Sequence, residues 1–217
     1  MTRKERFAKI SEALEQAFPN AEYELEFQTP YQLMVSITLA ARCTDKLVNQ
    51  ITPTLFNRYP TPQALAKATT QDLLQIISDV TYPESKANYL IEASRIISEK
   101  FNGEIPQNET ELTRLPGIGR KSANTILAQA YHLPAIAVDT HVARVSQRLK
   151  IATTNTPEGI EKELNLLIDK NRWIIEANRL TLLGRRVCTF NTPRCEECPV
   201  QTICQTPLEE NRQLSLF

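Results

Sequence analysis

A lysine and an aspartate are the residues whose types and surroundings point most directly to covalent chemistry. Lys121 ends the segment Leu115-Pro-Gly-Ile-Gly-Arg-Lys121, in which Gly117 and Gly119 predict a tight turn before a helix and allow positive dihedral angles there. The first turn of a helix presents N–H groups that bind phosphate. Arg120 and Lys121 are cations placed where the helix dipole disfavours them, which suggests a function. The dipole also favours the neutral amine that forms a Schiff base, whereas a simple phosphate contact is the plainer interpretation.

The aspartate is Asp139, in the segment Val138-Asp-Thr-His141, directly after an apolar run over residues 135–138. A carboxylate held rigidly at this point can stabilise a positively charged sugar and help to position an amine. Capping of the following helix is the plainer role, because aspartate is a preferred N-cap residue. His132 and His141 show no spacing typical of metal ligands, and we interpret both as structural.

Four cysteines follow in one turn-rich segment, with six, two and five residues between them: Cys188, Cys195, Cys198 and Cys204. A chain of 217 residues can bury a core without covalent cross-links, and its charged N-terminus lacks the apolar core of an export signal. The cluster therefore predicts a metal site and not disulfides. Zinc is the default metal for four thiolates, although zinc ribbons usually carry two Cys-x-x-Cys pairs and only one is present. Cys43 lies apart, and we expect a buried residue at a helix end.

The spacing of apolar residues predicts an all-α protein, because they recur every three or four positions and no segment alternates convincingly. Helix starts are indicated by typical N-cap residues: Thr29, Thr61, Thr69, Asn108 and Thr156. The predicted helices cover residues 3–17, 30–42, 45–58, 62–67, 70–79, 84–102, 108–114, 119–131, 139–149, 157–169 and 172–186.

A break near residues 133–138 divides this pattern into two domains. One would be a helical domain over residues 23–135 that ends in a hairpin, formed by the tight turn at Gly117 and Gly119 and its flanking helices. The other would join residues 1–22 to 136–217. The chain has 25 Lys and Arg residues and 25 Asp and Glu residues, but residues 111–150 carry a local excess of four positive charges. We expect this excess to form a patch that attracts DNA phosphates. No apolar run is long enough to span a membrane, which favours a cytoplasmic protein.

The three motifs occur in an order that resembles the endonuclease III family of DNA glycosylases, from Tyr31 to Cys204. The resemblance implies a six-helix barrel with a helix-hairpin-helix and a second domain in which the four cysteines hold a [4Fe-4S] cluster. It also implies that Lys121 attacks the sugar C1′ of a damaged nucleotide while Asp139 assists. The expected enzyme is a monomeric, bifunctional glycosylase and AP lyase that removes oxidised pyrimidines from duplex DNA and cuts the strand by β-elimination.

Two segments depart from that family, and both concern contacts with DNA. Arg42 stands where the family usually carries a glutamine that fills the gap left by the extruded base, and it could instead contact backbone phosphate. Tyr82, in the segment Thr81–Lys86, is either a second intercalating wedge or a core residue. The departures leave open a different lesion, such as an oxidised purine or a mismatched base.

The last five residues form a separate motif, Gln213-Leu-Ser-Leu-Phe217, at the end of a polar tail. They resemble the short peptide by which bacterial repair proteins bind the sliding clamp, with Gln213, Leu214, Leu216 and Phe217 entering a pocket. An end that folds back on the protein is the alternative. A module that binds damaged DNA or the clamp without catalysis also remains open, although the presence of both Lys121 and Asp139 argues against it.

Overall fold

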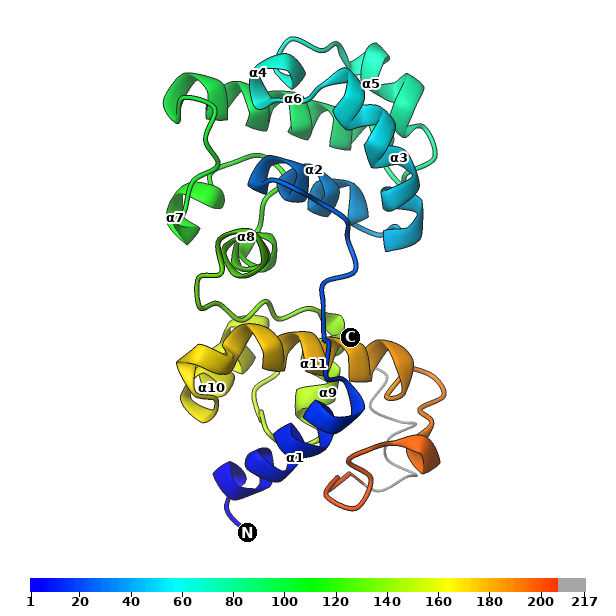
Figure 1. The fold of residues 1–217 in the computed structure, drawn as a ribbon, viewed down its shortest axis with the longest axis vertical. Coiled ribbons are helices and arrows are strands. Elements are labelled where there is room, and N and C mark those ends of the chain that lie inside the picture. The colour runs from blue at the N-terminus through cyan, green and yellow to red at the C-terminus, as the bar shows by residue number, and fades with distance from the viewer. Residues whose placement is uncertain (207–217) are drawn as a thin grey trace. The chain divides into compact units, whose positions relative to one another are not determined.

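The computed structural model describes residues 1–206, and helices are the only regular secondary structure in that range, which confirms the all-α prediction (Figure 1). The tail motif Gln213–Phe217 lies outside the described residues. The helices are α1 (Arg3–Ala17), α2 (Pro30–Ala40), α3 (Asp45–Arg58), α4 (Pro62–Leu65), α5 (Thr70–Ile77), α6 (Pro83–Lys100), α7 (Glu109–Leu112), α8 (Arg120–Tyr131), α9 (Thr140–Arg148), α10 (Pro157–Leu167) and α11 (Trp173–Arg186), with short 3-10 turns η1 (Lys170–Arg172) and η2 (Cys195–Glu197).

The helix starts follow from local side-chain chemistry. Each of the five expected N-cap residues accepts a hydrogen bond from a backbone N–H in the first turn of its helix. These bonds pair N–H groups that the helix itself leaves without a partner. The predicted caps are therefore confirmed.

The chain forms two compact units, one over Tyr23–Leu133 and one that joins Met1–Glu22 to the chain from Pro134 onwards. We call the first the hairpin unit and the second the cysteine unit. In the hairpin unit, α2 packs against α3, α6 and α8 and is buried on nearly all sides, with Leu33, Met34 and Leu39 fully enclosed.

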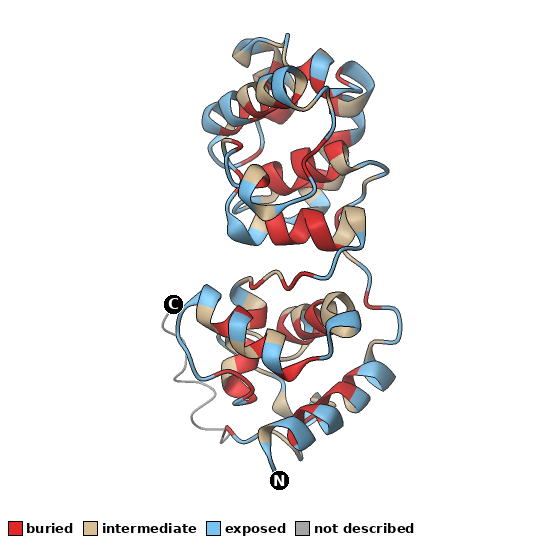
Figure 2. Ribbon diagram, turned by 90° about the vertical axis from the view of Figure 1, so that its left-hand side faces the viewer, coloured by how far each residue is buried: buried red, intermediate tan, exposed pale blue. Residues whose placement is uncertain are grey.

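In the cysteine unit, α9 packs closely against α11. Gly184 permits this approach, because a Cβ there would lie 2.8 Å from the Cβ of His141. Phe7, Ile10 and Leu14 of α1 complete the same core. Figure 2 shows the resulting pattern on α1, where buried positions form one face and exposed positions the other.

The clearest errors in the sequence prediction lie at helix ends. Helix α2 ends at Ala40 and not at residue 42, because Ala41 leaves the helical conformation with ψ of 109° and Arg42 adopts a left-handed conformation with φ of 58°. Cys43 therefore lies in a turn and is partly exposed, so the prediction of a buried cysteine at a helix end is wrong. Helices α5 and α10 also end two residues early, at Ile77 and Leu167.

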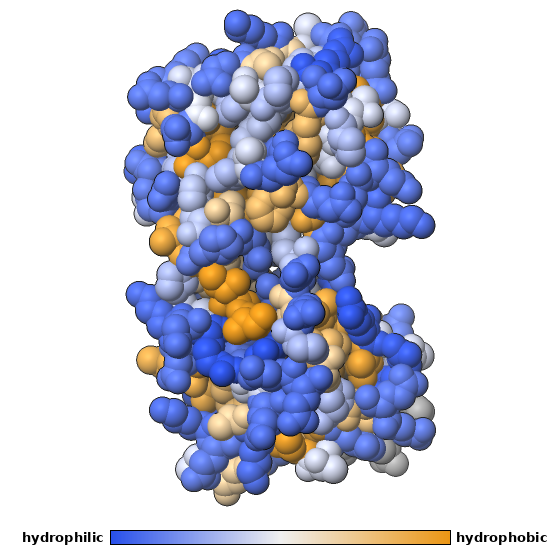
Figure 3. Space-filling view, viewed as in Figure 1, coloured by the Kyte–Doolittle hydropathy of each residue, from blue (hydrophilic) through white to orange (hydrophobic). Residues whose placement is uncertain are grey.

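The surface is mainly hydrophilic on the face viewed in Figure 3, where apolar areas are small and separate. Within residues 1–206, no helix combines the length and apolar character needed to cross a membrane.

Candidate active site and cysteine cavity

The hairpin between α7 and α8 is built on one required glycine. Gly117 has φ of +81°, and a Cβ at this position would lie 3.1 Å from the Cβ of Tyr89. Both the backbone conformation and the space therefore favour glycine. Gly119 differs, because its φ of −89° is available to any residue and a Cβ there would meet no atom within 4 Å. Both glycines allow a positive φ, but only Gly117 adopts one.

Lys121 is an exposed residue in the first turn of α8. The N-cap of this helix is Gly119, which provides no side-chain cap. Arg120, which we expected to contact DNA, forms an ion pair with Glu109 at 2.5 Å and so links α8 to α7. The hairpin thus places Lys121 at the positive end of a helix whose capping position carries no side chain.

Asp139 is the N-cap of α9, in the cysteine unit, and corresponds to Gly119 of α8. Its Oδ1 accepts a hydrogen bond of 2.8 Å from the N–H of Val142, so the capping role is present. Ile136 and Val138, directly before it, are buried and fix the entry to the helix. Capping holds the carboxylate in one direction at a half-buried position. This arrangement suits a group that must stabilise nearby positive charge.

His141 lies in the first turn of α9, one residue beyond Thr140. Burial lowers the pKa of His141, and the nearby cations Arg144 and Arg185 lower it further, against an opposing effect of Asp139. Its Nδ1 lies 3.2 Å from a guanidinium nitrogen of Arg144. These packed contacts agree with the structural role that we expected.

Arg42 and Tyr82 lie beside each other on the hairpin unit. A guanidinium nitrogen of Arg42 donates to the hydroxyl of Tyr82 at 3.3 Å, and the guanidinium carbon lies 5.9 Å from the ring centre. Tyr82 is 59% exposed, so its interpretation as a core residue is wrong. The structure therefore brings together the two residues expected to enter DNA, although they are 40 positions apart in sequence.

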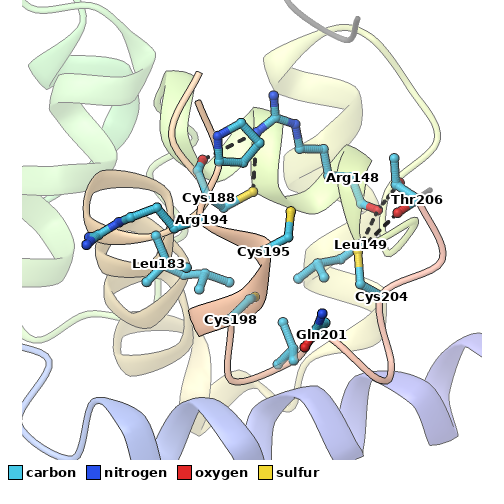
Figure 4. A pocket seen from close by; sticks show the side chains of 13 residues that line it. Arg148, Leu149, Leu183, Cys188, Arg194, Cys195, Cys198, Gln201, Cys204 and Thr206 are labelled. Carbon is cyan, nitrogen blue, oxygen red and sulfur yellow. Dashed lines mark hydrogen bonds between the residues drawn. The ribbon is translucent and has the colours of Figure 1, made fainter. Parts of the chain in front are cut away.

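The four clustered cysteines line one cavity of about 300 Å³ (Figure 4). Within residues 1–206, no three His, Cys, Asp or Glu side chains lie close enough to hold a single metal ion. A tetrahedral zinc site needs sulfur atoms only about 3.8 Å apart, given Zn–S bonds of ~2.3 Å. A [4Fe-4S] cluster binds each thiolate at a different iron, so its sulfurs are held further apart. Thiols that surround one cavity without converging on a point fit the larger group better.

Electrostatics in the cavity also favour a positively charged occupant. Burial raises the pKa of Cys198 to about 11, and repulsion from the other three thiols adds to this effect. Burial likewise raises the pKa of Cys204. These two thiols therefore ionise readily only where a cation compensates their charge.

Two arginines that the sequence prediction placed in a DNA-binding patch support this cavity instead. Arg148 is 1% exposed and donates to the Sγ of Cys188 at 3.4 Å and to the carbonyl of Thr189 at 2.7 Å. Arg144 donates to the carbonyl oxygens of Gly184 and Cys188 at 2.8 and 3.0 Å. The patch over residues 111–150 is therefore smaller than predicted. The arginines are four positions apart, and this spacing was the signal in the sequence that both lie on one helix face.

Comparisons with known proteins agree with this geometry. Residues 35–170 match the HhH-GPD superfamily of base excision DNA repair proteins. The chain is 41% identical to endonuclease III of Bacillus subtilis, over 87% of this chain and 86% of the relative. It is 34% identical to endonuclease III of Escherichia coli, over 86% of this chain and 89% of the relative.

Solved structures give the same result. A trapped endonuclease III–DNA covalent intermediate superposes with a TM-score of 0.90 at 35% identity, covering 98% of both chains. A non-covalent endonuclease III–DNA complex superposes with a TM-score of 0.91 at the same identity and coverage. The hairpin, the capped aspartate and the cysteine cavity thus occur together in a chain that belongs to the endonuclease III family of base excision DNA repair enzymes.

Proposed function

We propose that this enzyme is a bifunctional DNA glycosylase and AP lyase that removes oxidised pyrimidines from duplex DNA through a covalent bond to Lys121. The observation that carries the proposal is the exposed amine in the first turn of α8, a helix whose N-cap has no side chain. That position allows an amine to reach a sugar while the hairpin binds the adjoining phosphate.

The reaction begins with attack of the neutral Nζ of Lys121 on C1′ of the damaged nucleotide. The bond from C1′ to the base breaks, its electron pair leaves with the base, and the base takes up a proton. The sugar ring then opens to an imine linked to Lys121. Asp139 stabilises the positive charge that develops on the sugar and the imine.

Strand cleavage follows from the imine. Loss of a proton from C2′ drives departure of the phosphate at C3′, which is a β-elimination. Water then hydrolyses the imine and releases the amine of Lys121. Contacts with DNA come from two parts of the hairpin unit. Gly117 and Gly119 let the hairpin backbone approach phosphate, and the ion pair with Glu109 holds Arg120 beside them. Arg42 and Tyr82 enter the space left by the extruded nucleotide.

The four cysteines of the cavity would hold a [4Fe-4S] cluster. When bound, the cluster supplies four metal–thiolate bonds that fix the segment from Cys188 to Cys204, and a redox-active centre. Arg148 and Arg144 hold the start of this segment through Cys188. Iron and sulfide analysis with an absorption spectrum tests this assignment, and stoichiometric zinc without sulfide would contradict it.

Borohydride trapping tests the nucleophile. Protein is mixed with duplex DNA that contains one abasic site, and reduction of the imine leaves a stable covalent adduct. We expect the adduct with the native chain and with a Lys67→Ala control, whose lysine is exposed in the same unit, but not with Lys121→Ala. Absence of the adduct in the native chain, or its persistence in Lys121→Ala, would refute the assignment.

A different lesion preference is the second candidate, and Arg42 is the observation that favours it. An arginine can donate hydrogen bonds to an unpaired base in ways that a glutamine cannot. A panel of duplexes carrying an oxidised pyrimidine, an oxidised purine or a mismatch separates the candidates. Preferential excision of the second or third lesion would replace the proposed substrate.

The tail supports a further part of the proposal, which is binding of the bacterial sliding clamp by Gln213, Leu214, Leu216 and Phe217. The support is the sequence alone, in which an apolar pair follows a polar segment. We propose a monomer that acts on the chromosome in the cytoplasm. Deletion of residues 213–217 should abolish clamp binding in size-exclusion chromatography while leaving glycosylase activity on short duplexes intact, and unchanged clamp binding would remove the assignment.

A further inference from the structure

A buried lysine lies beneath the pair formed by Arg42 and Tyr82. Lys86 is in the first turn of α6 and is only 4% exposed. Its Nζ donates to the carbonyls of Leu39 and Ala41 at 2.8 and 2.7 Å, at the end of α2. The carbonyls at a helix end lack partners within the helix and carry partial negative charge, so they suit an ammonium group.

The third acceptor of this ammonium is a sulfur atom. The Sγ of Cys43 lies 3.4 Å from Nζ of Lys86 and also accepts the backbone N–H of Thr81 at 3.2 Å. Burial of an ammonium group is unfavourable unless hydrogen bonds compensate it. The structure describes three acceptors around Lys86, and each comes from the segment that carries Arg42.

Lys86 is at the same time tied to the segment that carries Tyr82. Its backbone N–H donates to the carbonyl of Tyr82 at 3.1 Å. Thr81 adds a cross-link, because its hydroxyl donates to the carbonyl of Arg42 at 3.0 Å. One residue therefore contacts both segments, with its side chain on the first and its backbone on the second.

Both segments hold an unfavourable backbone conformation. Arg42 has φ of 58° and Tyr82 has φ of 56°, in the left-handed region that residues with a Cβ rarely adopt. Such conformations persist only where surrounding contacts determine them, and they are common at functional sites. The contacts that determine them here include those made by Lys86 and Thr81.

We propose that Lys86 is a positioning residue that couples Arg42 and Tyr82, so that the two side chains enter DNA as one preformed unit. This inference rests on the proposed role of these two residues in base extrusion. Coupling in advance of binding avoids the cost of ordering two separate turns when the nucleotide leaves the stack. Lys86 itself is buried and does not touch DNA.

A double-mutant cycle tests the coupling. The affinity for a duplex with an abasic-site analogue is measured for the native chain, for Lys86→Met, for a variant with Arg42→Ala and Tyr82→Ala, and for the triple variant. Lys86→Met keeps an unbranched side chain that is one atom shorter, and removes the charge and the hydrogen bonds. We expect it to weaken binding roughly tenfold alone, the loss of about one charged hydrogen bond, and less than twofold in the triple variant.

A purely structural role gives a different result, because Lys86→Met would then weaken binding by the same factor in both backgrounds. That additive outcome overturns the proposal. Equal affinity of the native chain and the Arg42→Ala, Tyr82→Ala variant also overturns it. Lack of preference of the native chain for the abasic analogue would instead contradict the proposed function. Lys100→Met removes an exposed lysine from the other end of α6 and serves as the matched control.

Two further measurements keep the test decisive if Lys86→Met folds poorly. Thr81→Ala removes the cross-link to the carbonyl of Arg42 at an exposed position, and we expect a weaker effect of the same non-additive kind. A fluorescent 2-aminopurine opposite the lesion reports directly whether Arg42 and Tyr82 enter the DNA. Both Lys86→Met and Thr81→Ala should reduce its change on binding, and an unchanged response in both would refute the coupling.

Discussion

The two proposed catalytic residues lie at the starts of two helices, one in each unit, and these starts are built in opposite ways. The N-cap of helix α8 is Gly119, which has no side chain to cap it, and Lys121 is exposed in the first turn. The N-cap of helix α9 is Asp139, whose carboxylate accepts a hydrogen bond from the N–H of Val142. The same backbone feature has no side-chain cap in one unit and orients an acid in the other.

This contrast predicts that activity and stability are separable at Lys121 and linked at Asp139. The largest effect is expected for Lys121→Ala, which should reduce strand cleavage by roughly three orders of magnitude or more. Its thermal unfolding should match that of the native chain, since the side chain is exposed. A clear loss of stability would show that the open helix start depends on the lysine.

Asp139 should show the second largest effect, and two substitutions separate the effect of its charge from the effect of its capping role. Asp139→Ala removes both the charge and the cap, so it should lower activity by roughly a hundredfold and the free energy of unfolding by about 1 kcal/mol. Asp139→Asn keeps a good N-cap and removes the charge, so it should lower activity alone. Single-turnover kinetics and denaturant unfolding measure the two quantities. Equal stability of both variants would break the comparison.

The hairpin offers a matched pair of glycines for the third prediction. Gly117→Ala must adopt φ of +81° against Tyr89, and we expect a loss of about 1 to 2 kcal/mol of stability together with weaker DNA binding. Gly119→Ala meets open space at an ordinary φ, and its effect on stability should be within about 0.5 kcal/mol. Chemical unfolding of both variants decides this, and similar losses would contradict the assignment of the required glycine.

Helix starts could be predicted from the sequence because caps are local. A threonine, asparagine or aspartate acts on N–H groups two or three positions later, so neighbouring residues carry the whole signal. Helix ends could not be predicted as well. At the early end of α2, the carbonyl of Ala41 accepts a hydrogen bond from Lys86, which lies 45 positions further along the chain and reaches it only in the folded unit.

The charge exposed on the surface could not be predicted from the sequence for a similar reason. The sequence displays six cations over residues 111–150, but their burial is a tertiary property. Arg148 proves to be enclosed beside the cysteines, and Arg144 holds the same segment. The motifs of the proposed site are easier to recognise in the sequence, because they are short and contiguous, whereas the contact between Arg42 and Tyr82 joins distant segments.

The thiols of the two units provide the last and smallest expected effect. Partial burial tends to raise the pKa of Cys43, but hydrogen bonds from Thr81 and Lys86 outweigh it and hold the pKa below its usual value. In the cysteine unit, burial raises the pKa of Cys198 to about 11. Because the thiolate is the reactive form, Cys43 should be alkylated by iodoacetamide at lower pH than an ordinary cysteine.

Peptide mass spectrometry across a pH series measures the extent of alkylation at Cys43 separately from the other cysteines. In Lys86→Met, the loss of the ammonium group should move the midpoint of the profile to higher pH and slow alkylation a few-fold at neutral pH, by about the effect of one neighbouring charge. The exposed Lys100→Met control should leave the profile unchanged. A profile that is insensitive to Lys86→Met would mean that Thr81 alone activates the thiol, and the contrast between the two units would then reflect burial and not a buried cation.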